Sequence, residues 1–218
     1  MCFIIGTTFS GFSYVKYTDQ LACTALDEVN VGSFSSNFAW DDNHLASCIY
    51  AKTPTALFFH SRDDPNPLFG WNATYEATTQ TKFELWQYQY RFKLRLADSH
   101  KDDPNIPPLP PGKTYLHVIA DYLRIMRMHI QQVISKTGQI TGAQDIKWCL
   151  TVPAQWSQKA RADMHKAAEM AGMIRGAGAD DNGGSIHALS LVLEPEAAGV
   201  FSLNKNVHPA AAAKLFVS

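Results

Sequence analysis

The chain has 218 residues, of which 46% are hydrophobic, so it can bury a sizeable core as one large domain or two small ones. Nineteen basic and twenty acidic residues leave a formal charge of -1, and no run of about 18 apolar residues occurs. We therefore expect neither nucleic acid nor a membrane as a partner. The four cysteines form no CxxC pair and the first residues lack the basic charge of a signal peptide, which favours a reducing, cytoplasmic location.

The first third of the chain is expected to consist of short strands and turns. Cys2–Ile5 is apolar, Gly6-Thr7-Thr8 is small and polar, and a partly alternating aromatic pattern follows, which predicts strand, tight loop and strand. Residues 27–43 are rich in Ser, Asn, Asp and Gly, so we expect little regular structure there. Two short strands are predicted at Thr55–Phe59 and Pro67–Trp71, with a turn between them.

A proline-rich segment marks the clearest boundary in the chain. Five prolines lie between residues 98 and 112; they lack backbone donors and fix φ, which excludes helix and central strand. After it, Thr114 can cap a helix, because apolar residues recur at three- and four-residue spacing and predict a helix from about 115 to 136.

The second half alternates strands with helices. Ile146–Val152 predicts a strand, Ser157 can cap a helix that ends at Gly172, and residues 188–193 predict another strand. Glu194-Pro195 then opens a further helix, with proline at its favoured first turn. This succession predicts an α/β layer in which the strands are buried against helices.

The loop Gly6-Thr7-Thr8 between two strands suits the binding of phosphate. Glycine lets the backbone approach an anion closely, and amide N–H groups and two hydroxyls can donate to phosphate oxygens. The alternative interpretation is a hairpin whose turn is merely polar.

Further segments agree with the phosphate interpretation. In their order and spacing, five short motifs resemble the ATPase domain of the seventy-kilodalton heat-shock proteins, an actin-like ATPase. The form of the segment from Trp148 to Trp156, together with Glu196 where the common chaperones have threonine, resembles the divergent twelve-type branch and its fungal relatives. The motifs are Gly6-Thr7-Thr8-Phe9-Ser10-Gly11, Lys52-Thr53-Pro54-Thr55-Ala56, Phe69-Gly70-Trp71-Asn72-Ala73, Leu150-Thr151-Val152-Pro153-Ala154 and Leu193-Glu194-Pro195-Glu196-Ala197-Ala198.

The resemblance implies an α/β fold of two lobes around a cleft, each built on a ribonuclease-H-like mixed sheet with flanking helices, with ATP and magnesium between them. It covers the first lobe only. Residues 1–50 and 114–218 would form the basal subdomain, and 51–113 an inserted, smaller α+β subdomain. No Asp-Gly-Gly-Gly-Thr segment for a second phosphate loop occurs, so we expect a partial or truncated domain without the second lobe or a peptide-binding domain.

The resemblance also assigns site residues. Gly6, Thr7 and Thr8 match the first phosphate loop, and Glu194 matches the carboxylate that positions the attacking water. Glu194 could instead be a charge favoured by the helix dipole. Lys93 is the nearest match to a lysine that reaches the phosphates, with a solvated lysine or Arg95 in that role as the alternatives.

One departure from the family concerns the metal. The aspartate that organises the water shell of the metal in the family is replaced by Ile4, and a hydrocarbon cannot hold Mg²⁺ or its waters, so we predict no metal ligand in this chain. ATP hydrolysis is thus in doubt even where ATP or ADP binds.

Three functions remain open. The first is an incomplete chaperone-type ATPase domain that binds ATP with Mg²⁺ and engages a protein client or partner. The second is a non-catalytic interaction module, a pseudo-ATPase that retains the scaffold. The third is a sugar or acetate kinase relative, disfavoured because the segment from Leu193 to Ala198 resembles the chaperone branch.

Overall fold

A computed structural model describes residues 2–14, 35–36, 40, 51–100, 103–137, 146–176, 184–185 and 187–197. The segment 27–43, predicted to be irregular, lies largely outside these residues. Over the described part, the chain forms a mixed α/β structure, as predicted, and its strands lie in two sheets.

The larger sheet joins the two ends of the described chain. Strand β1 (Cys2–Ile5) pairs antiparallel with β2 (Phe9–Tyr14) on one side and parallel with β8 (Cys149–Val152) on the other. Strand β9 (Ser190–Leu193) lies parallel to β8. The strands β3 (Ser35–Ser36) and β4 (Thr53–Pro54) both pair with β2. The strands predicted at the start of the chain and in its second half are therefore confirmed.

The smaller sheet and its helix come from the middle of the chain. Strand β5 (Ala56–Phe58) pairs antiparallel with β6 (Leu68–Phe69) and with β7 (Tyr88–Tyr90). Helix α1 (Gly70–Thr79) follows β6 directly, and its first residue has a positive φ of 61°.

The prediction of a strand through Trp71 was wrong, because the chain turns into α1 at Gly70. Adding a Cβ to Gly70 would place it 2.1 Å from the hydroxyl oxygen of Thr53 in β4, so this turn depends on glycine. The helix itself carries many threonines and aromatic residues, which have modest helix propensity, and it has no acidic residue in its first turn. For these reasons the sequence pattern did not predict this helix.

The two long helices match their predicted ranges. Helix α2 (Tyr115–Ser135) begins after Thr114, whose backbone N–H donates to the His117 ring at 3.0 Å. Helix α3 (Gln158–Met170) is capped by Ser157, whose side chain accepts from the N–H of Ala160 at 3.2 Å. Gly172 follows α3 with φ 66°, the left-handed conformation that commonly ends a helix.

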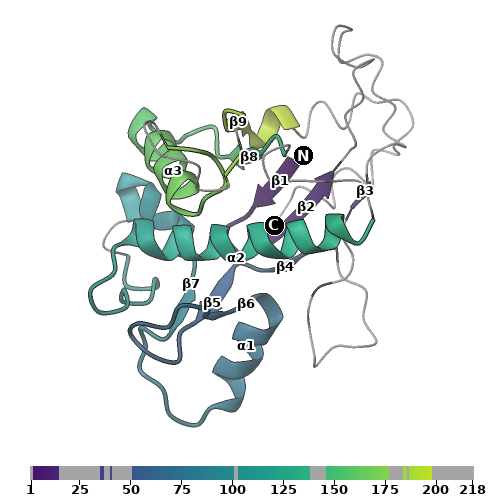
Figure 1. Ribbon diagram of the computed structural model, residues 1–218. Helices are drawn as coiled ribbons and strands as arrows, with labels where there is room; N and C mark the ends of the chain where they lie inside the picture. The colour runs from purple at the N-terminus through teal and green to yellow at the C-terminus, as the bar shows by residue number, and fades with distance from the viewer. Residues whose placement is uncertain are drawn as a thin grey trace, which may run out of the picture.

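Helix α2 organises the core. It runs across the middle of the molecule, with α3, β8 and β9 on one side and β5–β7 with α1 on the other (Figure 1). Its apolar face is fully buried and packs in one cluster with residues of β8 and α3. The largest buried side chains of that cluster include Trp148, Tyr122, Phe92, Leu123 and Met126.

The proline-rich segment is held against the body of the protein. Gln89 donates to the carbonyl oxygen of Pro108 at 2.7 Å, and Arg95 donates to that of Pro107 at 2.8 Å. Ile106 is buried. The segment from Pro104 to Pro111 contains neither helix nor strand, in agreement with the prediction. The exclusion of helix was wrong for the start of the stretch, where a 3-10 helix, η5 (Asp98–His100), precedes the first proline.

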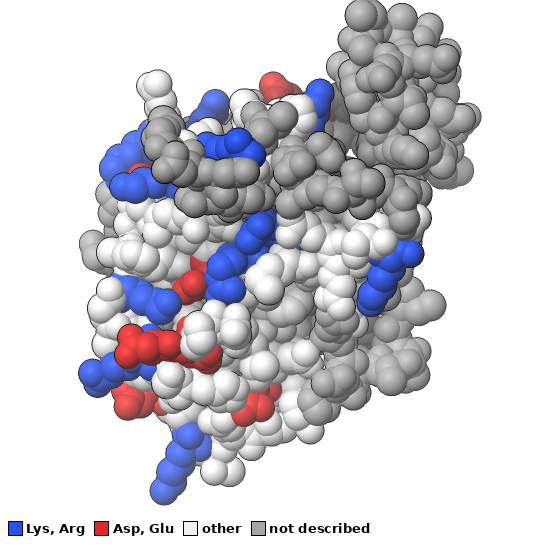
Figure 2. Space-filling view, in the orientation of Figure 1, with Lys and Arg blue, Asp and Glu red and all other residues white. Residues whose placement is uncertain are grey.

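The surface shows basic and acidic side chains interspersed on the face seen in Figure 2. Among the described residues, no helix has the length and apolar character that a membrane span requires.

Candidate functional site

Three parallel strands bring distant parts of the sequence to one edge of the larger sheet. Strands β1, β8 and β9 are adjacent and parallel, with Phe3 opposite Leu150 and Val152 opposite Leu193. Their carboxyl ends therefore meet at the same edge, where Gly6 follows β1 and Glu194 follows β9. In open α/β sheets, ligands bind outside the carboxyl ends of the strands.

The loop Gly6-Thr7-Thr8 forms a tight turn at this edge. The N–H of Gly6 donates to the carbonyl oxygen of Phe9 at 3.0 Å, and a Cβ on Gly6 would lie 2.3 Å from that oxygen. Thr7 is half-buried and Thr8 is exposed. Neither their amides nor their hydroxyls donate to any other residue that the structure describes. The turn thus presents two N–H groups and two hydroxyls that a ligand could use.

Lys93 connects the end of β1, just before the loop, to Glu194. It lies in a short 3-10 helix, η4 (Phe92–Leu96), and its side chain is only 3% exposed. Its Nζ donates to the carbonyl oxygen of Ile5 and to Oε1 of Glu194, the latter at 3.1 Å. The alternative of a solvated lysine is therefore wrong.

Arg95, the other alternative, makes a hydrogen bond to a different part of the chain. Its guanidinium donates to the proline-rich segment, at the carbonyl oxygen of Pro107. The structure thus brings Lys93, Glu194 and the start of the Gly6–Thr8 loop together, and it places Arg95 in a structural contact. We refer to Gly6, Thr7, Thr8, Lys93 and Glu194 as the candidate site.

The ion pair in the candidate site is unequally exposed. Burial lowers the pKa of Lys93, and the neighbouring Glu194 carboxylate opposes this by raising it. The Glu194 side chain is 40% exposed, so the pair opens to solvent on the carboxylate side only. A cation held in such surroundings interacts strongly with any further anion that approaches it, because solvent screens it weakly.

Two further residues of this region were not predicted as site residues. The Trp156 ring lies beneath Lys93, with Nζ 5.2 Å from the ring centroid. Thr55 donates from Oγ1 to the carbonyl oxygen of Gly6 at 2.9 Å. In the sequence, Thr55 is notable only because it lies in a short β-prone segment with alternating hydroxyl residues. Its contact with the Gly6 carbonyl arises only in the folded structure.

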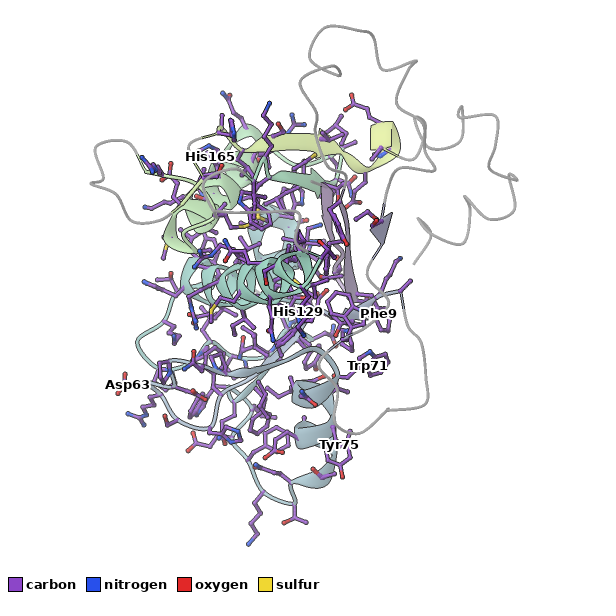
Figure 3. All side chains as sticks on the ribbon, turned by 45° about the vertical axis from the view of Figure 1, so that its right-hand side comes forward. Phe9, Asp63, Trp71, Tyr75, His129 and His165 are labelled. Atoms are coloured by element: carbon purple, nitrogen blue, oxygen red, sulfur yellow. The ribbon has the colours of Figure 1, made fainter. Side chains whose placement is uncertain are left out.

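An aromatic pair borders the candidate site. Phe9 follows the loop directly, and its ring centroid lies 6.1 Å from that of Trp71 on α1. Figure 3 shows the two side chains facing each other, with Tyr75 farther along the same helix. Through this contact, β2 of the larger sheet packs against α1, the helix that follows β6 of the smaller sheet.

The candidate site has donors for phosphate but not ligands for a metal. Four donor groups in the loop and the Lys93 ammonium match the acceptors of a phosphate chain. Mg²⁺ prefers several oxygen ligands, and the candidate site has one carboxylate, Glu194, which is already paired with Lys93. No cluster of three or more His, Cys, Asp or Glu residues exists among the described residues. The described residues of the candidate site therefore do not fit a metal ion as protein ligands.

Comparison with known proteins agrees with the motif resemblance. No family model matches the chain. Heat shock 70 kDa protein 12B of Homo sapiens is 30% identical to it over 216 residues, which cover 93% of this chain and 28% of that protein. Heat shock 70 kDa protein 12A of Homo sapiens is 24% identical over 217 residues, covering 88% of this chain and 30% of that protein.

The chain thus spans less than a third of the length of these curated relatives, while nearly its whole sequence aligns with them. The chain is therefore a divergent relative of the heat shock 70 kDa proteins that corresponds to part of an actin-like ATPase domain.

Proposed function

We propose that this chain is the first lobe of an actin-like nucleotide-binding domain and that its candidate site binds the phosphate groups of ATP or ADP. The observation that carries the proposal is the position of Lys93. The Lys93 side chain is only 3% exposed, and it lies at the carboxyl ends of parallel strands. There it contacts both the residue before the Gly6–Thr8 loop and the Glu194 carboxylate. In this reading, the sheet is of the ribonuclease-H type, residues 1–50 and 114–218 form the basal subdomain, and 51–113 form the inserted one.

Burying the charged Lys93 costs desolvation free energy, and the partly exposed Glu194 carboxylate offsets only part of that cost. Burial indeed lowers the pKa of Lys93 despite the presence of Glu194. Sites that bind or transfer charged groups commonly keep such costly residues. A phosphate chain would supply the additional negative charge that Lys93 lacks in the protein alone.

Each residue of the candidate site has a distinct part in this proposal. The amides and hydroxyls of Thr7 and Thr8 would donate to phosphate oxygens, and Gly6 allows the close approach of the backbone. Lys93 would neutralise the phosphates from the buried side. Glu194, which is the more exposed member of the pair, would hold Lys93 in place and could orient a water at the terminal phosphate. Because Mg²⁺ is usually bound through substrate phosphates and one or two carboxylates, the ion would enter the site with ATP.

A calorimetric titration of the folded chain tests the proposal. We expect ATP and ADP to bind with measurable heat and AMP to bind at least tenfold more weakly, because AMP lacks the phosphates that would reach the loop. Lys93→Met should abolish binding. Arg95→Met, the matched control, removes the cation of the same short helix that donates to the carbonyl oxygen of Pro107, and it should retain binding. Absence of heat for ATP with folded protein would contradict the proposal.

A second function, a scaffold that no longer hydrolyses ATP, is favoured by the poor fit to a metal. Ile4 lies in β1, one residue before the carbonyl group that Lys93 binds. By the motif resemblance, Ile4 would stand where the related domains have the aspartate that organises the metal. On this reading the chain binds a protein partner, and ATP turnover stays at background even in Ile4→Asp. Turnover gained by that single substitution, measured as phosphate release, would exclude the non-catalytic reading.

A further inference from the structure

Three carbonyl groups at the loop accept hydrogen bonds from a single segment of the chain. The carbonyl oxygen of Ile5 accepts from Lys93, and that of Gly6 accepts from Thr55 Oγ1 at 2.9 Å. The carbonyl oxygen of Thr8 accepts from the backbone N–H of Thr55 at 2.8 Å. Both Thr55 and Lys93 belong to the segment 51–113, so this segment supplies every one of these donors.

The bond from Thr55 determines which way the loop presents its amides. In a trans peptide unit the C=O and N–H groups point in opposite directions, and the described chain contains no cis peptide. The carbonyl of Gly6 shares its peptide unit with the N–H of Thr7. Because Thr55 holds that carbonyl toward the interior, the N–H of Thr7 is directed away from the interior. An anion-binding loop needs this polarity, with amides outward and carbonyls inward.

The hydroxyl of Thr55 is itself held in position. Thr55 is 1% exposed and Ser10 is fully buried, and their hydroxyl oxygens lie 2.8 Å apart. Thr55 gives its only hydroxyl proton to Gly6, so Ser10 must be the donor in this contact. The Tyr122 hydroxyl on α2 faces the same pair, and burial raises its pKa more strongly than Ser10 and Thr55 lower it. The loop is thus connected through two hydroxyls to the buried core.

We infer that Thr55 is a positioning residue for phosphate binding: by holding the Gly6 carbonyl inward, it keeps the Thr7 amide directed toward the ligand. This inference rests on the proposed function of the candidate site. It differs from a purely structural role, in which Thr55 would satisfy a buried carbonyl without affecting how an anion binds.

Thr55→Val is the main test, because it keeps the shape of the side chain and removes the hydroxyl. We expect its affinity for ATP to fall by about fivefold to tenfold, the effect of losing one positioned hydrogen bond. Thr55→Ser, which retains the hydroxyl, should bind within about twofold of the wild type. Thr74→Val makes the same chemical change at a hydroxyl bonded to Gly70 and Tyr88, away from the loop, and should bind as the wild type does.

Amide hydrogen exchange of Gly6, measured by NMR without ligand, gives a second readout. The N–H of Gly6 donates to Phe9 across the loop, so a loosened loop should expose it, and we expect faster exchange in Thr55→Val but not in Thr55→Ser or Thr74→Val. If the wild type binds ATP and folded Thr55→Val binds equally well, the inference is wrong. If the wild type binds no ATP, the proposed function is wrong, and the exchange of Gly6 still decides whether Thr55 orders the loop.

Ser10→Ala covers the case in which Thr55→Val does not fold. It removes only the donor that orients the Thr55 hydroxyl, so the bond to Gly6 should weaken without being lost. We expect a loss of affinity of about twofold to threefold together with faster Gly6 exchange. Unchanged affinity and unchanged exchange in folded Ser10→Ala would overturn the inference as well.

Discussion

The unequal exposure of the ion pair in the candidate site predicts that its two members respond in opposite ways to substitution. In Glu194→Gln, the buried Lys93 loses its counterion. Removing one partner of a fully buried pair costs about 3–5 kcal/mol of unfolding free energy. Because the Glu194 side chain is 40% exposed, water replaces part of the lost interaction, and we expect a loss of about 1–2 kcal/mol at pH 7.

Lys93→Met should behave differently, although it breaks the same pair. It removes the buried charge and leaves a side chain of similar length, while the Glu194 carboxylate that remains can be hydrated. We expect its unfolding free energy to lie within about 1 kcal/mol of the wild type. The residue that is more important for binding phosphate would then be the less important for stability.

The pH dependence of the Glu194→Gln deficit gives a stricter test. Burial lowers the pKa of Lys93 below its ordinary value and Glu194 opposes this, so the substitution lowers the pKa further. The deficit relative to the wild type is complete at pH values below the pKa of Lys93 in the variant. It shrinks as the pH rises through that pKa, because neutral lysine needs no counterion.

Urea unfolding followed by tryptophan fluorescence at pH 7 and at a series of higher pH values measures both effects. The control is Lys159→Met, which breaks the pair of the exposed Lys159 with Asp163 and should leave the urea midpoint close to that of the wild type. A deficit for Glu194→Gln that grows with pH would refute this reasoning, as would a larger loss for Lys93→Met than for Glu194→Gln.

Three further substitutions test the fold around the site. Gly6→Ala should destabilise the protein by about 1–3 kcal/mol and weaken ATP binding, because its Cβ would lie 2.3 Å from the carbonyl oxygen of Phe9; wild-type stability in urea would contradict the turn. Ser157→Ala should lower the unfolding free energy by about 1 kcal/mol, because it removes the side chain that accepts from the Ala160 N–H. Ser157→Asp can still accept this bond and should retain stability. Equal melting of the wild type and both variants would exclude the cap. Tyr122→Phe should change stability by less than about 1 kcal/mol, because the Tyr122 hydroxyl is buried without a well-formed hydrogen bond; a loss above about 2 kcal/mol would show that the hydroxyl is bonded.

Local patterns in the sequence were sufficient for the elements whose stability depends on local physics. The three- and four-residue spacing of apolar residues predicted α2 to within one residue at its carboxyl end, because a helix repeats its buried face with that period. Ser157 and Gly172 marked the limits of α3, because capping and the left-handed conformation are properties of single residues. Helix α1 was missed, because its sequence has neither a cap nor a strong apolar period and its start depends on contact with Thr53.

The candidate site depended on contacts that no local pattern contains. Short motifs identified Gly6–Thr8 and Glu194 through resemblance, but they left Lys93 undecided between a ligand and a solvated side chain. The fold decided that question, because Lys93 and Glu194 are 101 residues apart and meet only when β1 and β9 end at the same edge of the sheet. Thr55 was overlooked for the same reason. A hydroxyl acquires a role in orienting the loop only once the sheet has buried it against the Gly6 carbonyl.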